Sequence, residues 1–171
     1  YTSSGAATTN GIFCGINVTS GNVDIGTITG NNIGATSGNG SIYTANTTSG
    51  GAIVGIYASS ANTVNIQNNT IGAFDAMGTA ANSGGITGIN TSGGLTGVIN
   101  VSNNTIGNSV NPNLRMGTLT TAGNLSNVGT TFGISTGSGV FRGILNNSTG
   151  AVTIGPNTIR NASLNSSSSS A

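Results

Sequence analysis

The stretch VNIQNNTIG, residues 64–72, carries the pattern that decides the fold: an aliphatic residue, an asparagine three positions later and an isoleucine two positions after that. The pattern occurs four times, as Ile28/Asn31/Ile33, Ile66/Asn69/Ile71, Val101/Asn104/Ile106 and Ile154/Asn157/Ile159. Successive copies start 38, 35 and 53 residues apart (66−28, 101−66 and 154−101), so the connecting loops vary while the core pattern does not. Such self-similarity is typical of proteins in which one supersecondary unit stacks on copies of itself.

A second shared element precedes each copy. It is a Gly-Ile pair, found at Gly15-Ile16, Gly55-Ile56, Gly88-Ile89 and Gly143-Ile144. Apolar and polar residues alternate at Val64 and Ile66, which is the period of a half-buried strand. Glycine and β-branched residues dominate and disfavour helix. The sequence therefore predicts the same succession of elements in each unit: a Gly-Ile strand, a short polar turn, a Val-x-Ile strand, an asparagine turn and a Thr-Ile strand.

Strands this short are best accommodated if equivalent strands of successive units pair in parallel, about 4.8 Å apart. The sequence therefore predicts an all-β fold, a parallel β-helix (β-solenoid) of about four coils with variable loop insertions. We expect residues 1–164 to form a single domain and residues 165–171 to form a Ser-rich tail. The sequence leaves open the hand of the coil and the number of strands in the 107–140 insertion, where Gly133-Ile134 is a candidate extra strand.

The repeat also predicts which side chains stack. We expect three aliphatic ranks in the core: Ile28, Ile66, Val101 and Ile154; Ile33, Ile71, Ile106 and Ile159; and Ile16, Ile56, Ile89 and Ile144. The asparagines should form a structural ladder at a shared bend, where the residue tolerates left-handed backbone angles and its amide bonds to the layers above and below. The members of this ladder are Asn31, Asn69, Asn104 and Asn157.

The charge inventory argues against catalysis. Only 3% of the 171 residues are charged, namely Asp24, Asp75, Arg115, Arg142 and Arg160, and the chain has no Glu, Lys or His. Acid–base catalysis, nucleophile activation and most metal sites use the side chains that are missing. We therefore expect no catalytic residue, no metal site and no cofactor, and we expect the three arginines to be solvated or bonded to carbonyls.

The composition also limits the classes of binding partner. With a net charge of +1, the chain has no cluster of basic residues that could bind the phosphates of a nucleic acid. No apolar segment approaches the roughly 18 residues that a membrane-spanning helix needs. Cys14 is the single cysteine and should be a small buried hydrophobe. We expect Tyr1 to begin a processed mature chain or a fragment.

The segments VNIQNNTIG, INVSNNTIG (99–107) and VTIGPNTI (152–159), each with a Gly-Ile pair upstream, resemble the repeat of right-handed parallel β-helix proteins. More narrowly, the chain is similar to the long Asn/Thr/Ser/Gly-rich β-strand-repeat exoproteins of Bacteroidota-like bacterial surfaces. The likeness covers residues 11–163 and implies a secreted, extracellular or cell-surface location. Enzymes of the β-helix group need a carboxylate pair or an Asp cluster with Arg or Lys, and Asp24 and Asp75 lie in non-equivalent places.

The leading functional hypothesis is a non-catalytic structural segment of an extracellular filament, stalk or adhesin. It would associate by stacking of strand edges, either with further copies of itself or with further repeats. The alternative is a carbohydrate- or surface-binding module, with Tyr43, Tyr57 and Phe141, together with Phe74, as candidate contacts for surface glycans. Polysaccharide degradation and ice binding are further alternatives. For ice binding, Asn32, Thr70, Thr105 and Thr158 would form one outward column, beside a ragged column of Thr29, Gln67, Ser102 and Gly155.

Overall fold

The computed structural model describes residues 2–3, 12–46, 52–78, 85–93, 97–109, 113–118 and 140–164. Over these residues the protein is all-β, with no helix, and every strand pairing is parallel. Gly133-Ile134, most of the 107–140 insertion and the Ser-rich tail lie outside the described residues.

The strands form four sheets, named A to D. Sheet A contains β1 (Thr2–Ser3), β5 (Ile42–Asn46), β9 (Phe74–Gly78), β13 (Leu114–Thr118) and β17 (Ala162–Leu164). Sheet B contains β2 (Phe13–Val18), β6 (Ala52–Ala58), β10 (Gly85–Gly93) and β14 (Phe141–Ser148). Sheet C contains β3 (Val23–Ile25), β7 (Val64–Gln67), β11 (Val98–Ser102) and β15 (Ala151–Ile154). Sheet D contains β4 (Asn32–Gly34), β8 (Thr70–Gly72), β12 (Thr105–Ile106) and β16 (Thr158–Ile159).

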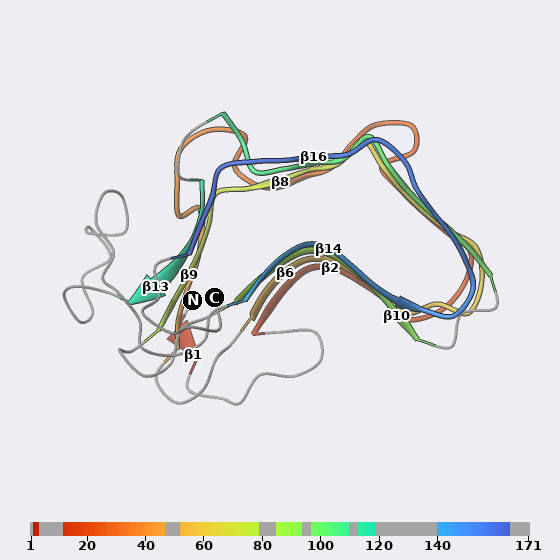
Figure 1. The fold of residues 1–171 in the computed structure, drawn as a ribbon, viewed down its shortest axis with the longest axis horizontal. Coiled ribbons are helices and arrows are strands. Elements are labelled where there is room, and N and C mark those ends of the chain that lie inside the picture. The colour runs from red at the N-terminus through yellow and green to blue at the C-terminus, as the bar shows by residue number, and fades with distance from the viewer. Residues whose placement is uncertain are drawn as a thin grey trace.

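The chain visits the sheets in a fixed order. It runs through B, C, D and A and then returns to B, and each strand pairs with its equivalent from the preceding passage. We call one passage a layer, so layer 1 is β2–β5 and layer 4 is β14–β17. Viewed along the stack, the paths of the four layers superimpose around a common interior (Figure 1).

The interior is filled by the aliphatic ranks. In sheet D, Ile33, Ile71, Ile106 and Ile159 pair in register. In sheet B, Ile16, Ile56, Ile89 and Ile144 do the same. Ile71, Ile106, Ile56 and Ile89, from layers 2 and 3, are fully buried. Ile159 of layer 4 is 47% exposed, because no described strand lies beyond it.

The third rank begins at a different residue from the one predicted. Ile66 pairs with Ile25, not with Ile28, and the rank continues through Val101 to Ile154, which is 51% exposed at the end of the stack. Ile28 is 98% exposed, so its assignment to the core was wrong. In layer 1, Asn31 follows Ile25 by six positions (31−25), whereas in layer 2 Asn69 follows Ile66 by three (69−66). The additional residues leave the stack as a bulge at 26–30 and carry Ile28 outward.

The Gly-Ile pair has a packing explanation. Sheet B arches toward sheet D (Figure 1), and a Cβ added to Gly55 or Gly88 would lie 2.8 Å from a methyl carbon of Ile71 or Ile106. The same Cβ would lie 2.5 Å or 2.6 Å from the carbonyl oxygen of the glycine in the next layer. Only glycine allows the two sheets to approach this closely.

Replacement of Gly88 by alanine is therefore expected to destabilise the protein by about 1–3 kcal/mol, the usual cost of overpacking a core. Gly143→Ala is the matched control, because the three atoms nearest to its added Cβ all belong to the side chain of Ile159, which is 47% exposed in layer 4, and none belongs to the backbone. Denaturant unfolding of both variants measures the difference. Equal losses would show that the contact with the backbone of the next layer does not decide the cost.

Candidate functional site

The four predicted ladder asparagines lie in one file at the bend between sheets C and D. Nδ2 of Asn31 donates to Oδ1 of Asn69 at 2.8 Å, Asn69 to Asn104 at 2.9 Å, and Asn104 to Asn157 at 3.0 Å. The backbone N–H of the same donor residue reaches the same Oδ1, at 3.0–3.1 Å. Asn69 and Asn104 are buried. Oδ1 of each of these acceptor asparagines thus accepts hydrogen bonds from both the side chain and the backbone of the asparagine in the preceding layer.

Each ladder amide also ties its own layer to the one before. Nδ2 of Asn104 donates to the carbonyl of Ser102 in its own turn at 3.0 Å and to the carbonyl of Ile66 in the preceding layer at 2.9 Å. Asn69 and Asn157 repeat both bonds with their own equivalents. The bend is therefore held by side-chain hydrogen bonds where the backbone ladder is interrupted.

The left-handed backbone angles expected at the ladder asparagines belong to their neighbours. Asn68 and Asn103, one residue earlier, have φ of 60° and 58°, whereas no described ladder asparagine has a positive φ. Asparagine tolerates this conformation better than most residues. In the Asn-Asn doublet, the first asparagine thus adopts the left-handed conformation of the turn, and the second makes the hydrogen bonds of the ladder.

A second buried amide cluster lies at the bend between sheets D and A. Oδ1 of Asn113 accepts from the backbone N–H of Ala73 at 3.0 Å and of Asn108 at 2.8 Å, and its Nδ2 donates to the carbonyl of Gly38 at 2.8 Å. Asn108 and Asn113 are both buried. This cluster was not predicted from the sequence, because its members come from loops of different length, which share no spacing.

A further ladder runs along the outer face of sheet C. Nδ2 of Asn65 donates to Oδ1 of Asp24, and Nδ2 of Asn100 donates to Oδ1 of Asn65, both at 2.7 Å. Register continues the column to Thr153. Asp24 is exposed at the layer 1 end of this column. The only signal in the sequence was the Val-x-Ile alternation, whose central residue faces outward.

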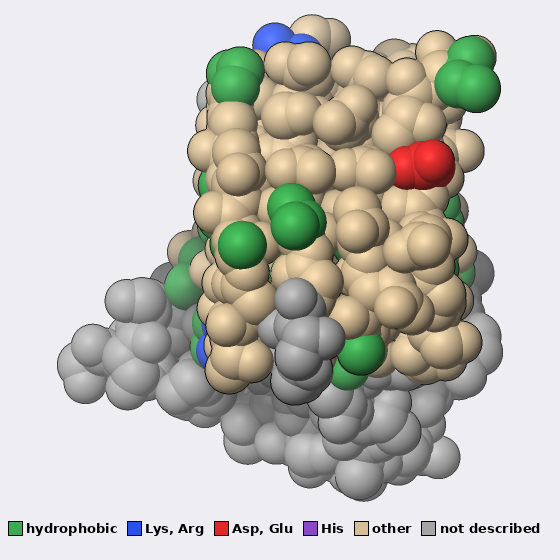
Figure 2. Space-filling model, turned by 90° about the vertical axis from the view of Figure 1, so that its right-hand side faces the viewer, with side chains coloured by type: hydrophobic (Ala, Val, Ile, Leu, Met, Phe, Trp, Pro, Cys, Tyr) green, Lys and Arg blue, Asp and Glu red, His purple; other side chains and the backbone are tan. Residues whose placement is uncertain are grey.

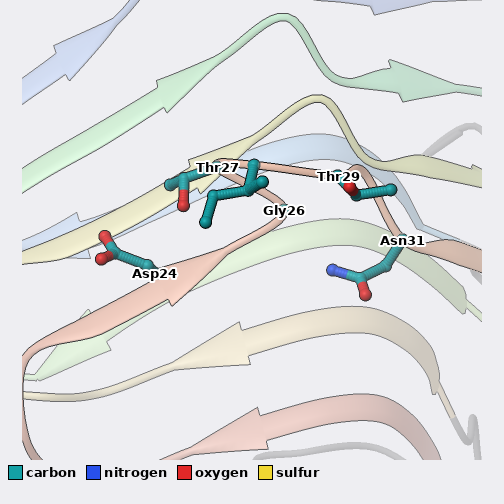
Figure 3. Close-up of a pocket in the computed structure, with 6 residues that line it drawn as sticks. Asp24, Gly26, Thr27, Thr29 and Asn31 are labelled. Atoms are coloured by element: carbon teal, nitrogen blue, oxygen red, sulfur yellow. The ribbon is translucent and has the colours of Figure 1, made fainter.

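The bulge in layer 1 forms a shallow hollow beside the ladder. It is lined by six residues, which are Asp24, Gly26, Thr27, Ile28, Thr29 and Asn31. Figure 3 shows the side chains of Thr27 and Thr29 on the bulge, with Asp24 on β3 before it and Asn31 after it, one residue before β4. The hollow therefore lies at the layer 1 end of the stack, next to the first rung of the ladder.

Asp75 and Arg115 form a buried ion pair, contrary to the expectation that the arginines are solvated or bonded to carbonyls. They occupy paired positions of β9 and β13, and each is almost fully buried. Arg115 Nε donates to Asp75 Oδ1 at 2.7 Å, and Nη2 donates to Oδ2. Burial raises the pKa of the Asp75 carboxyl, while the hydrogen bonds and charge of Arg115 oppose that shift. Arg142 and Arg160 are exposed.

The aromatic residues proposed as surface contacts do not form a sugar-binding face. Tyr43 and Tyr57 are 8% and 7% exposed, and Phe74 is fully buried, so their assignment to the surface was wrong. Phe141 is half-buried and packs against the core cluster. The outer face shown in Figure 2 is mainly uncharged polar side chains and backbone, with scattered hydrophobic side chains.

The column considered for ice binding does exist. Asn32, Thr70, Thr105 and Thr158 pair in register on sheet D. Of the second column, Gln67 pairs with Ser102, whereas Thr29 lies on the bulge of layer 1. A regular pair of threonine ranks is therefore not formed over the described residues.

Over the described residues, the strand edges at the two ends of the stack are unpaired. Among the described strands, none pairs with the outer side of β2, β3 or β4 at one end, or of β14, β15, β16 or β17 at the other. Unpaired edges offer a row of backbone donors and acceptors to another strand. Cys14, on the edge strand β2, is a free, partly buried thiol, and burial raises its pKa.

Over the part of the chain that the structure describes, no group of three or more His, Cys, Asp or Glu side chains could hold a metal ion. No helix in the same residues has the length and apolar character needed to span a membrane. Comparison of the chain with family models, curated proteins and solved structures gives no match.

Proposed function

We propose that this chain is a non-catalytic structural segment of a secreted filament, stalk or adhesin, built as a closed β-solenoid whose copies associate end to end. The observation that carries the proposal is the contrast between the middle and the ends of the stack. Strands of layers 2 and 3 are paired on both sides, whereas at both ends of the stack the outer strand edges have no pairing partner among the described residues. Natural repeat proteins of this type need terminal caps to stay monomeric.

The chemistry of the ends supports association. Ile154 and Ile159 present half-exposed aliphatic side chains on the layer 4 end, in ranks that would continue into another layer. Charge does not oppose the contact, because the chain carries few charges and its net charge is +1. A contact between two different ends does not close on itself and generates open filaments.

The burial of Asp75 against Arg115 keeps that carboxyl away from solvent, so the residues described here favour a structural role over hydrolysis of a polysaccharide. The burial of Tyr43 and Tyr57 removes the main argument for a glycan-binding module. Secretion and surface location follow from the sequence resemblance alone and remain part of the proposal.

Light scattering and electron microscopy of the purified chain test the proposal. We expect the mass to rise with protein concentration, with little dependence on ionic strength, because salt screens only charges. Fibre diffraction should give a reflection at about 4.8 Å along the fibre axis, the spacing of stacked strands. Monomers at every concentration would contradict end-to-end association.

A further inference from the structure

Residues 35–41 of layer 1 reach across layer 2 to the buried amide cluster of layer 3. In layer 2 the single residue Ala73 joins β8 to β9, whereas residues 35–41 extend beyond that path at the bend between sheets D and A, as the orange loop at the upper left of Figure 1. Nδ2 of Asn113 donates to the carbonyl of Gly38 at 2.8 Å, and Nδ2 of Asn108 donates to the same carbonyl at 3.2 Å. Gly38 therefore joins layer 1 to layer 3.

The two residues after Gly38 are Asn39 and Gly40, the only Asn-Gly pair within the described residues. Both are partly exposed. Gly40 has a φ of 60°, a left-handed angle that glycine adopts at little cost. Its backbone N–H donates no hydrogen bond to a described residue. The nitrogen of Gly40 is therefore not held in a hydrogen bond that would keep it from reacting with the neighbouring side chain.

We propose that Asn39 is a site of spontaneous modification, at which the side-chain amide is converted through a succinimide to isoaspartate. The nitrogen of Gly40 attacks Cγ of Asn39, the Cγ–Nδ2 bond breaks, and the proton from the attacking nitrogen leaves with the ammonia. Water then opens the ring. Cleavage at the main-chain carbonyl of Asn39 gives isoaspartate, in which the backbone runs through Cγ, and cleavage at Cγ gives aspartate. Water is the only co-reactant.

The fold blocks the same chemistry at the asparagine ladder. Three ladder asparagines are followed by a threonine whose backbone N–H donates, at 2.8 Å, to the carbonyl of the ladder residue in the preceding layer: Thr70 to Asn31, Thr105 to Asn69 and Thr158 to Asn104. The nitrogen must leave this bond before it can attack, which slows the reaction by about 5- to 150-fold, equivalent to the roughly 1–3 kcal/mol of an unpaired donor. The β-branched threonine side chain also stiffens the site. Asparagine is a thermolabile residue in general, and the structure distinguishes Asn39 from the ladder residues.

Modification of Asn39 would act directly on the contact with layer 3. Isoaspartate adds a methylene carbon to the backbone immediately after Gly38 and replaces a neutral amide with a carboxylate. The carbonyl of Gly38 would then move relative to Nδ2 of Asn113, whose Oδ1 accepts the backbone N–H of Ala73 and of Asn108. We therefore expect the modification to loosen the bend between sheets D and A. This inference concerns the chain itself and does not depend on end-to-end association.

Incubation of the full chain at mildly alkaline pH, followed by peptide mass spectrometry, tests the site. Alkaline pH accelerates the reaction because the attacking nitrogen must lose its proton. We expect the peptide that contains Asn39 to gain the mass difference between a hydroxyl and an amino group, and to accept a methyl group from an isoaspartyl methyltransferase. Peptides with Asn69 and Asn104 should react at least about five times more slowly. Asn39→Gln should abolish the signal from its peptide.

Thr105→Gly separates the effect of the fold from that of the neighbouring residue, because it creates an Asn-Gly pair on the ladder. We expect Asn104 in this variant to resist modification in the folded protein and to react as fast as Asn39 in denaturant. Circular dichroism checks that the variant folds. In the wild-type chain, unfolding should accelerate the reaction at Asn69 and Asn104 and change the rate at Asn39 little, which tests the same point without a substitution.

Two results would overturn the inference. If Asn39 stays unmodified in the folded chain but reacts in denaturant, the fold protects it and the site is rejected. The effect on the bend is tested by hydrogen exchange of the backbone N–H groups of Ala73 and Asn108, which should be faster in the isoaspartate form. Asn39→Asp is the matched control, because it adds the carboxylate without lengthening the backbone. Equal exchange in the two forms would reject the proposed loosening.

Discussion

Replacement of Asn104 by alanine is expected to lower the free energy of unfolding by about 2–6 kcal/mol. Oδ1 of Asn104 accepts both the backbone N–H and the Nδ2 of Asn69, at 3.0 Å and 2.9 Å. Removing it leaves the buried backbone N–H of Asn69 without an acceptor, at a cost of about 1–3 kcal/mol, whereas Nδ2 of Asn69 keeps its bonds to the carbonyls of Ile25 and Gln67. The carbonyls of Ile66 and Ser102 also lose the hydrogen bonds that Asn104 donates, each worth about 0.5–1.5 kcal/mol. Denaturant unfolding at low protein concentration measures the loss.

Asn100→Ala is the matched control for this variant. Asn100 lies in the same layer, on the outer face of sheet C, where its Nδ2 makes a hydrogen bond to Asn65. The net loss for one such partly solvated bond is about 0.5–1.5 kcal/mol. A comparable loss at Asn100 and Asn104 would mean that the inner ladder contributes no more than an ordinary surface hydrogen bond.

The parts of the fold that could be predicted from the sequence are those with fixed spacing. Ile66, Asn69 and Ile71 have equivalents at the same separations in layers 3 and 4, because the short strands of sheets C and D leave no room for an insertion between them. Stacking then follows from register, since a one-residue slip would turn each core side chain outward. Layer 1 is the exception. The spacing in the sequence predicts Ile28 as the core residue, whereas Ile25 is the residue that pairs with Ile66.

A signal for the correct residue was present. Val23 and Ile25 show the same alternation as Val64 and Ile66, with which they pair. Gly26 and Gly30 bracket the bulge, and a Cβ on Gly26 would lie 2.5 Å from Oδ1 of Asn69. The glycines therefore allow the additional residues to leave the stack while the ladder continues through Asn31.

Sheet A was missed because its strands have no constant distance from the repeat core. Phe74 follows Ile71 by three residues, whereas Leu114 follows Ile106 by eight and Ile42 follows Ile33 by nine. Variable loops remove the periodicity on which repeat detection depends. The same variation concealed that Asp75 and Arg115, 40 residues apart, occupy equivalent positions of adjacent strands.

The buried ion pair of Asp75 and Arg115 leads to the second large expected effect. Asp75→Asn, which keeps the shape of the side chain, should cost about 3–5 kcal/mol, because it leaves the guanidinium buried without a counter-charge. Arg115→Met should cost a similar amount by leaving the carboxylate unpaired. Asp24→Asn is the control for loss of an acidic group, since Asp24 is exposed and such groups contribute at most about 1 kcal/mol.

The double variant Asp75→Leu/Arg115→Met distinguishes two roles for the pair. Replacing both charges of a buried pair by apolar side chains of similar volume is often neutral or stabilising, so we expect the double variant to regain most of the stability lost in either single one. A loss equal to the sum of those of Asp75→Leu and Arg115→Met, each measured singly, would contradict direct coupling between the two residues. If stability returns, we infer that the ion pair serves mainly to fix the strand register. It aligns β9 with β13 in sheet A, where the preceding loops vary in length. A double variant that is stable but no longer associates end to end would link that alignment to the shape of the layer 4 edge.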